Sequence, residues 1–504
     1  MPFTLQGRLA WPHGEICTVG VQGSTIASIV PGGDEAAGAL WITPGFVDAH
    51  GHPPLLGDQL ASVDLSGAAS YAQALRTIHD ANVPSGWLLG GGWDQHRWPD
   101  APQGGWPLAD DLERVAKGRP ALLHRVDRHA VWASRTALAS AGITRDTPDP
   151  PAGHIVRDTN GHPTGVLVDR AAELLSAPPP DDTERERRLR AALASLASHG
   201  LTGVHEMAAD DATWRIYRRM DDAGELPIRV WVWVLEGTEA AESLMRDGPY
   251  RGKRLAGRGI KAFADGALGS HGALLAEPYL DHPSTRGLCL ATPQALEKLA
   301  RSCLQSSLQL AVHAIGDGAV GNTLDAFEAA LRTHGRAPAS PLRIEHAQIL
   351  GEGDALRMAR LGAVASMQPV HATSDMPWVE RVIGPERVRR AYAWRTLVDA
   401  GVSLALGSDF PIESPSPARG VWAAVTRAAW GGEPGVGWHP EQRLTLAEAV
   451  AGFTTGAAWA AGEAPGTCAV RVGAVANLSV WRAEGDPTAP RLEPQMTIVG
   501  GERV

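Results

Sequence analysis

The sequence lacks the features of an oxidised, membrane-bound or nucleic-acid-binding protein. Its 504 residues contain only four cysteines, which lie far apart, so neither a disulfide framework nor a cysteine zinc site is expected. No apolar run reaches the roughly 18–20 residues that span a bilayer. The first residues lack the basic region and apolar core of a signal peptide. The net charge of −10 argues against a nucleic-acid surface. These absences predict a soluble cytoplasmic protein that binds neither nucleic acid nor membrane.

Lysine is also scarce, because the basic residues are nearly all arginine. The only lysines are Lys117, Lys253, Lys261 and Lys298, so the position of each one is informative. With 44% apolar and 20% charged residues, the composition is that of an ordinary globular protein. The chain is longer than a single simple core of about 250–300 residues. We therefore expect a large barrel with additions, or two to three domains.

The middle of the chain alternates strands with amphipathic helices. Eight segments have strand character: Phe46–His52, Gly203–Met207, Ile228–Val234, Ile260–Asp265, Leu308–Ile315, Leu342–Ala347, Ala363–Gln368 and Val402–Asp409. Helices are expected between them, at Thr183–Ser198, Ala212–Ala223, Pro293–Gln305, Val320–Thr333 and Pro385–Ala400. This eightfold alternation predicts an α/β fold, a (β/α)8 TIM-type barrel over residues 44–469, with its chemistry at the carboxyl ends of the strands.

Two further regions interrupt or flank the predicted barrel. Residues 1–43 and 470–504 both consist of short strands and turns, which predicts one small β-sandwich domain built from the two ends. Residues 55–185 are too long for a loop after the first barrel strand. This insertion contains Trp93 and Trp98 and ends in a proline-rich stretch, and we expect it to form a cap over the barrel mouth.

The first predicted barrel strand ends in His50-Gly51-His52. Alternate residues of a strand face the same side, so both imidazoles point the same way. Zinc binds such nitrogens at about 2.0–2.1 Å. A pair this short could also be two unrelated surface histidines.

Polar residues recur at the carboxyl ends of the other predicted strands. They are His205 and Glu206 on the second strand, Lys261 and Asp265 on the fourth, His313 on the fifth, His346 on the sixth and Asp409 on the eighth. One histidine at the end of an apolar strand is more often a core residue than a ligand. Histidines at the chemical ends of four strands, with an aspartate and a lysine, indicate a metal centre.

This pattern resembles the amidohydrolase superfamily, and within it amidohydrolase family 3, which includes N-substituted formamide deformylases. The resemblance covers nearly the whole chain and is carried by Pro44–His50, Asp265–Ser270, His313–Asp317, Arg343–Ala347 and Gly407–Pro411. It implies hydrolysis of an amide-type C–N bond and one or two divalent metal ions, usually zinc. It implies as ligands His50, His52, Lys261, His313, His346 and Asp409.

The chemistry of these residue types agrees with that role. Zinc lowers the pKa of bound water to about 7 and so supplies hydroxide at neutral pH. A buried lysine beside cations favours its neutral amine, which can take up carbon dioxide, and the resemblance implies that carboxylated Lys261 bridges two metals. Asp409 would bind metal and carry the proton from water to the leaving nitrogen. Alternatives are a lysine at an edge strand, or a mononuclear enzyme with unmodified Lys261.

Other residues are candidates for substrate binding. They are His205, His271, His371, Asp127, His129 and Trp93, of which His205 could equally fill the barrel. The sequence departs from the family pattern at His271, Gly272 and Gly318, so the substrate pocket is expected to differ from that of the formamide enzymes. The tryptophans of the insertion suggest an apolar or aromatic substrate group.

We therefore predict a metal-dependent amidohydrolase acting on an N-acyl, N-formyl or related small molecule, with Asp409 as proton shuttle. The same machinery could act on an ester, a carbamate or a cyclic amide. A protein of another class, a non-catalytic barrel that binds without reacting, would have lost a ligand, whereas every expected ligand position is filled. The resemblance also implies a possible homodimer.

Overall fold

The computed structural model describes all residues except 1, 10–13, 35–37, 82–85, 128, 336–339, 433–434 and 465–466. The chain divides into two compact units. The first consists of Met1–Pro53 with Ala192–Val504, and the second of Pro54–Ala191. In the described part of the chain, no helix combines the length and the apolar character needed to cross a membrane.

The first unit contains the predicted parallel barrel. Its eight strands, in spatial order, are β5 (Phe46–Gly51), β12 (Leu201–Ala209), β13 (Arg229–Leu235), β15 (Leu255–Phe263), β16 (Gln309–Ala314), β17 (Arg343–His346), β18 (Val364–Met367) and β19 (Leu404–Leu406). Every neighbouring pair is parallel, and β14 (Tyr250–Arg251) adds an antiparallel partner to β15. The prediction of a (β/α)8 fold is confirmed.

Backbone hydrogen bonds link the first and last barrel strands beyond their ends. The Asp409 amide donates to the His50 carbonyl at 2.7 Å, and the His52 amide donates to the Phe410 carbonyl at 3.0 Å. Gly51 and Phe410 form the parallel bridge between these segments. The chain after β19 is thereby fixed against the His50-x-His52 segment, where the predicted ligands lie.

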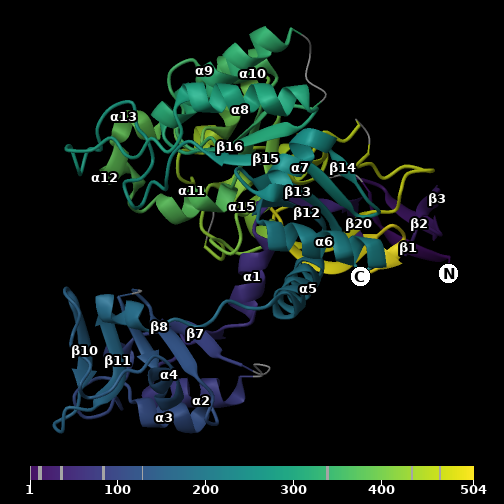
Figure 1. Cartoon of the computed structure of the whole chain (residues 1–504). Coiled ribbons are helices and arrows are strands. Elements are labelled where there is room, and N and C mark those ends of the chain that lie inside the picture. Colours follow the sequence, from purple (N-terminus) through teal and green to yellow (C-terminus); the bar gives the residue numbers. More distant parts are fainter. Residues whose placement is uncertain are drawn as a thin grey trace. The chain divides into compact units, whose positions relative to one another are not determined.

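Helices follow the strands around the barrel. They are α6 (Asp211–Ala223), α7 (Glu239–Asp247), α8 (Pro293–Gln305), α9 (Asp317–His334), α10 (Asp354–Leu361), α11 (Pro369–Asp375), α12 (Val379–Ile383), α13 (Pro385–Val388), α14 (Trp394–Asp399), α15 (Pro417–Thr426), α16 (Leu446–Ala451) and α17 (Ala457–Ala460). Side-chain caps begin several of them, as at Asp210 and Thr292, which each accept a backbone N–H in the first turn. Figure 1 shows α8 and α9 side by side along β16.

The predicted single helix Pro385–Ala400 is wrong. It is divided into α13 and α14, and Tyr392 between them has a left-handed backbone (φ 51°). The Tyr392 amide donates to the Gln348 carbonyl at 2.7 Å, and its buried hydroxyl contacts Asp375. These buried hydrogen bonds draw the chain inward and end the helical path.

Strands from both ends of the chain form one seven-stranded sheet. Its order is β22 (Glu502–Arg503), β21 (Arg491–Val499), β20 (Leu478–Glu484), β4 (Leu40–Pro44), β1 (Phe3–Arg8), β2 (Ile16–Gln22) and β3 (Thr25–Pro31). Thr25 at the outer strand also pairs with Val475, close to the central β20, so the sheet curls back on itself. Apolar side chains from both ends of the chain, such as Val19, Ile42 and Ile498, share the core that it encloses.

The second unit has its own mixed sheet and core. The sheet contains β10 (Gly153–Arg157), β11 (Pro163–Asp169), β9 (Ala130–Ala133), β8 (Ala121–Arg125), β7 (Leu88–Trp93) and β6 (Val63–Asp64). Helices α2 (Tyr71–Asp80), α3 (Ala109–Val115) and α4 (Arg135–Ser140) belong to this unit, with α3 and α4 packed on the sheet (Figure 1). Helices α1 (Pro53–Leu60) and α5 (Asp182–Ser198) lie at its two ends. The expected role of the insertion as a cap stays a prediction.

Trp481 joins the curled sheet to the barrel, which leads to a stability prediction. Its side chain is fully buried, its ring lies 4.8 Å from the Phe46 ring, and its indole N–H donates to Thr43 Oγ1 at 3.1 Å. Trp481→Ala is expected to destabilise the protein by about 3 kcal/mol or more, because a large buried cavity remains and the Thr43 hydroxyl keeps only its hydrogen bond to the Ser479 carbonyl. Urea unfolding followed by circular dichroism measures this. Trp459→Ala, at a tryptophan that is 42% exposed, is the control and is expected to change the midpoint little.

Candidate metal centre

The predicted ligands come together at the carboxyl ends of the barrel strands. His50 lies in β5, Lys261 in β15, His313 in β16 and His346 at the end of β17, while Asp409 follows β19. One donor atom from each of His50, His346 and Asp409 lies within 4.8 Å of the other two. The ring centroids of His313 and His346 are 4.5 Å apart. Distant segments of the chain therefore supply one cluster of nitrogen and oxygen donors.

Asp409 lies where the segment after the last barrel strand, β19, meets the first strand, β5. Its Oδ1 lies 3.0 Å from Nε2 of His52 and 3.6 Å from Nε2 of His50, and its Oδ2 lies 3.8 Å from Nε2 of His371. Burial alone would raise its pKa, but the hydrogen bond from His52 and the nearby imidazoles hold the pKa of Asp409 well below its usual range. The carboxylate is therefore ionised and available to a cation at neutral pH.

His50, His313 and His346 are neutral at pH 7. Burial, and then the nearby Lys261, lower the pKa of His50 to about 4 and that of His313 to about 3. Burial and the neighbouring His313 place the pKa of His346 well below its usual value. Neutral imidazole is the form that binds metal, and His313 Nε2 is buried without a hydrogen-bond partner in the described part of the structure.

Lys261 carries a buried amine that lies 5.2 Å from the centre of the Phe263 ring. Its side chain is 1% exposed, and Nζ has no hydrogen-bond partner among the residues that the structure describes. Burial lowers the pKa of Lys261 to about 8. A substantial fraction is therefore neutral near physiological pH, which is the state that can react with carbon dioxide.

The backbone at two candidate ligands is strained. His346 (φ 70°) and Asp409 (φ 60°) both have left-handed backbone, as does Ala347 (φ 41°). Such conformations cost of the order of 1–3 kcal/mol per non-glycine residue and concentrate at functional sites. They turn the ends of β17 and β19 so that both side chains enter the cluster.

The donor set fits a divalent cation. It offers unprotonated imidazole nitrogens, an ionised carboxylate and a buried amine that has no hydrogen-bond partner among the described residues. Imidazole with carboxylate suits zinc and related first-row metals.

Two polar side chains that the sequence reasoning missed orient these histidines. Glu345 Oε2 accepts from His50 Nδ1 at 2.7 Å, and Gln368 Oε1 accepts from His346 Nδ1 at 2.8 Å. In the sequence, Glu345 lies in Arg343–Ala347, a stretch that carries the family resemblance, but only its place directly before His346 bears on its role. On a strand, adjacent side chains face opposite sides, so this signal would have suggested that the two point apart.

Two further buried carboxylates hold the loops around the cluster. Asp48 accepts from the amides of His50 at 3.0 Å and Ser408 at 3.1 Å, and from the Ser408 hydroxyl at 2.7 Å. Asp265 accepts from the amides of Gly316 and Leu274, each at 2.8 Å. Burial raises the pKa of Asp48 and of Asp265 to about 7 in each case. Asp265 also lies 3.5 Å from His313 Nε2.

The candidate substrate residues of the first unit have three different positions. His371, near the start of α11, faces Asp409 and stacks on His346 with ring centroids 6.1 Å apart. His205 is fully buried between Trp231 and Trp233 inside the barrel, which favours the alternative that it fills the core. His271 is on the loop after β15 and pairs with Asp281 at 3.1 Å.

The candidate substrate residues of the second unit lie either in its core or at its surface. Trp93 is fully buried in that unit's core beside Trp98, and its indole donates to the Leu123 carbonyl, so the expectation that Trp93 contacts a substrate is contradicted. Asp127 accepts from the His129 amide, and His129 pairs with Asp169 at the surface. The tryptophans of the insertion stabilise their own domain.

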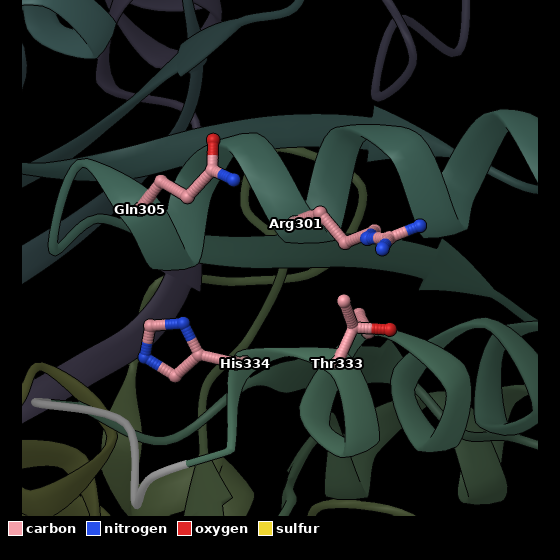
Figure 2. Close-up of a pocket in the computed structure, with 5 residues that line it drawn as sticks. Arg301, Gln305, Thr333 and His334 are labelled. Atoms are coloured by element: carbon pink, nitrogen blue, oxygen red, sulfur yellow. The ribbon is translucent and has the colours of Figure 1, made fainter.

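A surface cleft outside the cluster has a volume of about 350 Å³ (Figure 2). It is lined by Arg301, Gln305, Ala330, Thr333 and His334, from the last turns of α8 and α9. Because α8 ends just before β16 begins, this cleft is at the amino ends of the strands and is not part of the candidate centre.

Nearly the whole chain is similar to known proteins. The model of the amidohydrolase family matches residues 36–504. Amidohydrolase YtcJ of Bacillus subtilis is 34% identical over 92% of this chain and 88% of its own length. N-substituted formamide deformylase of Arthrobacter pascens is 30% identical over 93% of this chain and 88% of its own. The crystal structure of an uncharacterized metal-dependent hydrolase from Pyrococcus furiosus superimposes with a TM-score of 0.76 at 25% identity, covering 97% of this chain and all of that one.

Glu206, beside the candidate centre on β12, is buried with Tyr217 as its partner. The Tyr217 hydroxyl donates to Glu206 Oε2 at 3.0 Å. Burial raises the pKa of Glu206 from 4.5 to about 7, against a lowering influence of His52. The folded state therefore binds this proton more tightly than the unfolded chain, so stability from this group is present at low pH and lost as the pH rises to 7.

Glu206→Gln is expected to be more stable than the wild type above pH 7, by up to about 3 kcal/mol, because glutamine has no charge to bury. The difference should shrink toward zero near pH 4. Urea unfolding at pH 5, 6, 7 and 8 measures it, with the exposed Glu352→Gln as control. A difference between Glu206→Gln and wild type that does not change over this range would refute the buried-carboxyl interpretation.

Proposed function

This chain belongs to the amidohydrolase family, whose members are metal-dependent hydrolases, and we propose that it hydrolyses an amide-type C–N bond of a small N-acyl or N-formyl compound. The observation that carries the proposal is the convergence of His50, His346 and Asp409, with their donor atoms within 4.8 Å. The nearby Lys261 amine, which acts on the pKa of His50, has no hydrogen-bond partner among the described residues. The likeness to N-substituted formamide deformylase supports the bond type.

Six side chains would hold the metal: His50, His52, Lys261, His313, His346 and Asp409. A divalent ion there, which we propose to be zinc, supplies a water of lowered pKa and polarises the substrate carbonyl. We propose two ions, which a carboxylated Lys261 would help to hold, because a neutral buried amine can take up carbon dioxide and a carbamate would supply the negative charge that two cations need.

Asp409 is the proposed proton carrier. Its carboxylate faces the imidazoles of His52 and His371 and is ionised in the resting enzyme. It accepts the proton that the attacking water loses and donates it to the leaving nitrogen, which must be protonated before it departs as an amine. We propose that His371, whose Nε2 lies 3.8 Å from Oδ2 of Asp409, binds the substrate near that leaving group.

Apolar side chains beside the cluster support a substrate with an apolar substituent. The Phe263 ring lies 5.3 Å from the His313 ring and is 37% exposed. Ile412, whose amide donates to the Asp409 carbonyl, is 69% exposed, and Leu290, bonded to the Ala264 carbonyl, is 57% exposed. Exposed large apolar groups at a polar centre are characteristic of a substrate wall. Phe263 thus replaces the insertion tryptophans as the proposed apolar contact.

Location and assembly complete the proposal. All four cysteines are free, as in proteins of a reducing compartment, so we propose that the enzyme is cytoplasmic. A homodimer is also proposed, from the family resemblance. An ester, a carbamate or a cyclic amide would present the same carbonyl to the same residues.

Metal analysis tests the centre directly. Purified protein supplied with zinc is expected to hold close to two equivalents per chain, and Lys261→Ala one or fewer, because the carboxylated lysine that would help to hold the ions is lost. Elemental analysis after dialysis measures this. The control is Lys253→Ala, which should retain both ions. Lys253 lies just before β15, at the amino end of that strand, and its amine donates to the Asp222 carbonyl.

One equivalent in both the wild type and Lys261→Ala would leave a mononuclear hydrolase and remove Lys261 from the mechanism. No bound zinc in the wild type would refute the hydrolase and favour a binding protein.

Hydroxamates, which chelate zinc, test the apolar wall without knowledge of the substrate. Zinc-loaded protein should bind benzohydroxamate more tightly than acetohydroxamate, and Phe263→Ala should reduce this preference about fivefold, because one aromatic contact is lost. Isothermal titration calorimetry measures both, with Phe3→Ala as control. An unchanged preference in Phe263→Ala would show that this ring does not face the ligand.

A further inference from the structure

We propose that Glu345, held by Arg343, is a positioning residue that fixes the tautomer of His50 and thereby makes Nε2 of His50 available to the metal. The proposal builds on the metal centre of the proposed function and assigns a role to a buried charge pair that is not among its ligands. It rests on hydrogen-bond geometry inside the barrel.

Arg343 is fully buried and crosses the barrel interior. Its Nη2 donates to the Ala49 carbonyl at 2.9 Å and to Ser366 Oγ at 3.0 Å, and its Nη1 lies 2.9 Å from His205 Nδ1. Its Nε donates to Glu345 Oε1 at 2.8 Å. The guanidinium therefore joins β5, β12, β17 and β18, and a group with so many directed contacts has one orientation.

Glu345 transmits that orientation to His50. Its Oε1 accepts a hydrogen bond from Arg343 Nε. Its Oε2 accepts from both Arg343 Nη2 at 3.2 Å and His50 Nδ1 at 2.7 Å. Glu345 is fully buried beside a guanidinium, so it is an ionised carboxylate that only accepts hydrogen bonds. His50 must then carry its proton on Nδ1, and its Nε2 lone pair faces Asp409.

His205 is fixed in the opposite tautomer by the same arginine. Arginine has no acceptor, so His205 Nδ1 must accept from Arg343 and the proton must lie on Nε2. His205 therefore cannot act as a ligand through either nitrogen without losing this contact. One guanidinium thus separates two neighbouring histidines into a ligand and a structural residue, which explains why His205 is not part of the donor cluster.

The partner of His50 differs in charge from that of His346. Gln368, which accepts from His346 Nδ1, is neutral and donates its own amide to the Ser366 carbonyl at 3.2 Å. A carboxylate behind an imidazole makes it a stronger electron donor than an amide does, and removal of such a partner typically weakens metal binding 10- to 100-fold. We therefore expect the ion bound by His50 to depend on Glu345.

The test is Glu345→Gln, which keeps the size and removes the charge. The amide oxygen of glutamine will turn to the two N–H donors of Arg343, so its NH2 group will face His50 Nδ1 and force the proton of His50 to Nε2. NMR of 15N-histidine-labelled, metal-free protein reads the tautomer of each ring. Competition with a chromophoric chelator reads zinc affinity, which is expected to fall at least about 10-fold for one ion.

Glu463→Gln is the matched control. Glu463 is also a buried glutamate near an arginine, with Trp231 Nε1 donating to it at 2.9 Å and Arg229 at 3.6 Å, but it lies at the amino end of β13, away from the cluster. This variant is expected to keep the zinc affinity and the His50 tautomer of the wild type. Glu345→Asp, which retains the charge, should recover part of the zinc affinity.

The outcomes separate this inference from the proposed function. A wild-type His50 with its proton on Nε2, or a Glu345→Gln variant with unchanged tautomer and zinc affinity, overturns the positioning role. The wild-type tautomer decides the question even if Glu345→Gln fails to fold. Wild-type protein that binds no zinc but carries His50 in the Nδ1–H form contradicts the proposed function while leaving the role of Glu345 in orienting His50 intact.

Discussion

The buried ion pair between Arg343 and Glu345 is the interaction on which the candidate centre depends. Two charges without exposed surface are costly to remove from water, and a pair of hydrophobic residues in their place is often no less stable. Here the pair fixes the orientation of the hydrogen bonds to His50 and His205. The arginine has donors for several strands and the carboxylate has only acceptors, so together they leave one arrangement of protons on His50 and His205. Loss of either partner would leave an uncompensated charge in the barrel.

The barrel architecture explains why so small a set of residues suffices. Parallel strands bring their carboxyl ends to one edge, so one or two polar residues per strand meet there although they are far apart in the chain. The closing hydrogen bonds between the ends of β5 and β19 then fix Asp409 against His50 and His52. The left-handed backbone at Asp409 and His346 is held by this surrounding structure, and it directs both side chains inward. The strained backbone thus occurs at the residues whose side chains it directs into the cluster.

Much of the fold could be predicted because its signals are local. Eight apolar segments with strand character, separated by helical periodicity, predicted the barrel, and their ends lie within a few residues of the observed ones except for the earlier start of β15 at Leu255. The helix predicted across Tyr392 failed because the hydrogen bonds that interrupt it come from Gln348 and Asp375, which are distant in sequence. Trp93 was misassigned for a related reason. The sequence alone does not indicate whether a tryptophan in an insertion faces a substrate or packs in a domain core.

The sequence by itself determined the residue types of the centre and the strands that carry them, because histidine, lysine and aspartate at the ends of apolar segments are visible in one dimension. Tertiary structure alone decided which nitrogen of His50 and of His346 is free and why His205 is excluded. It also revealed that Phe263 lies beside the cluster. The physical reason is that proton positions and apolar contacts depend on partners brought from other strands, such as Glu345 for His50 and Gln368 for His346. No spacing in the chain encodes these pairings.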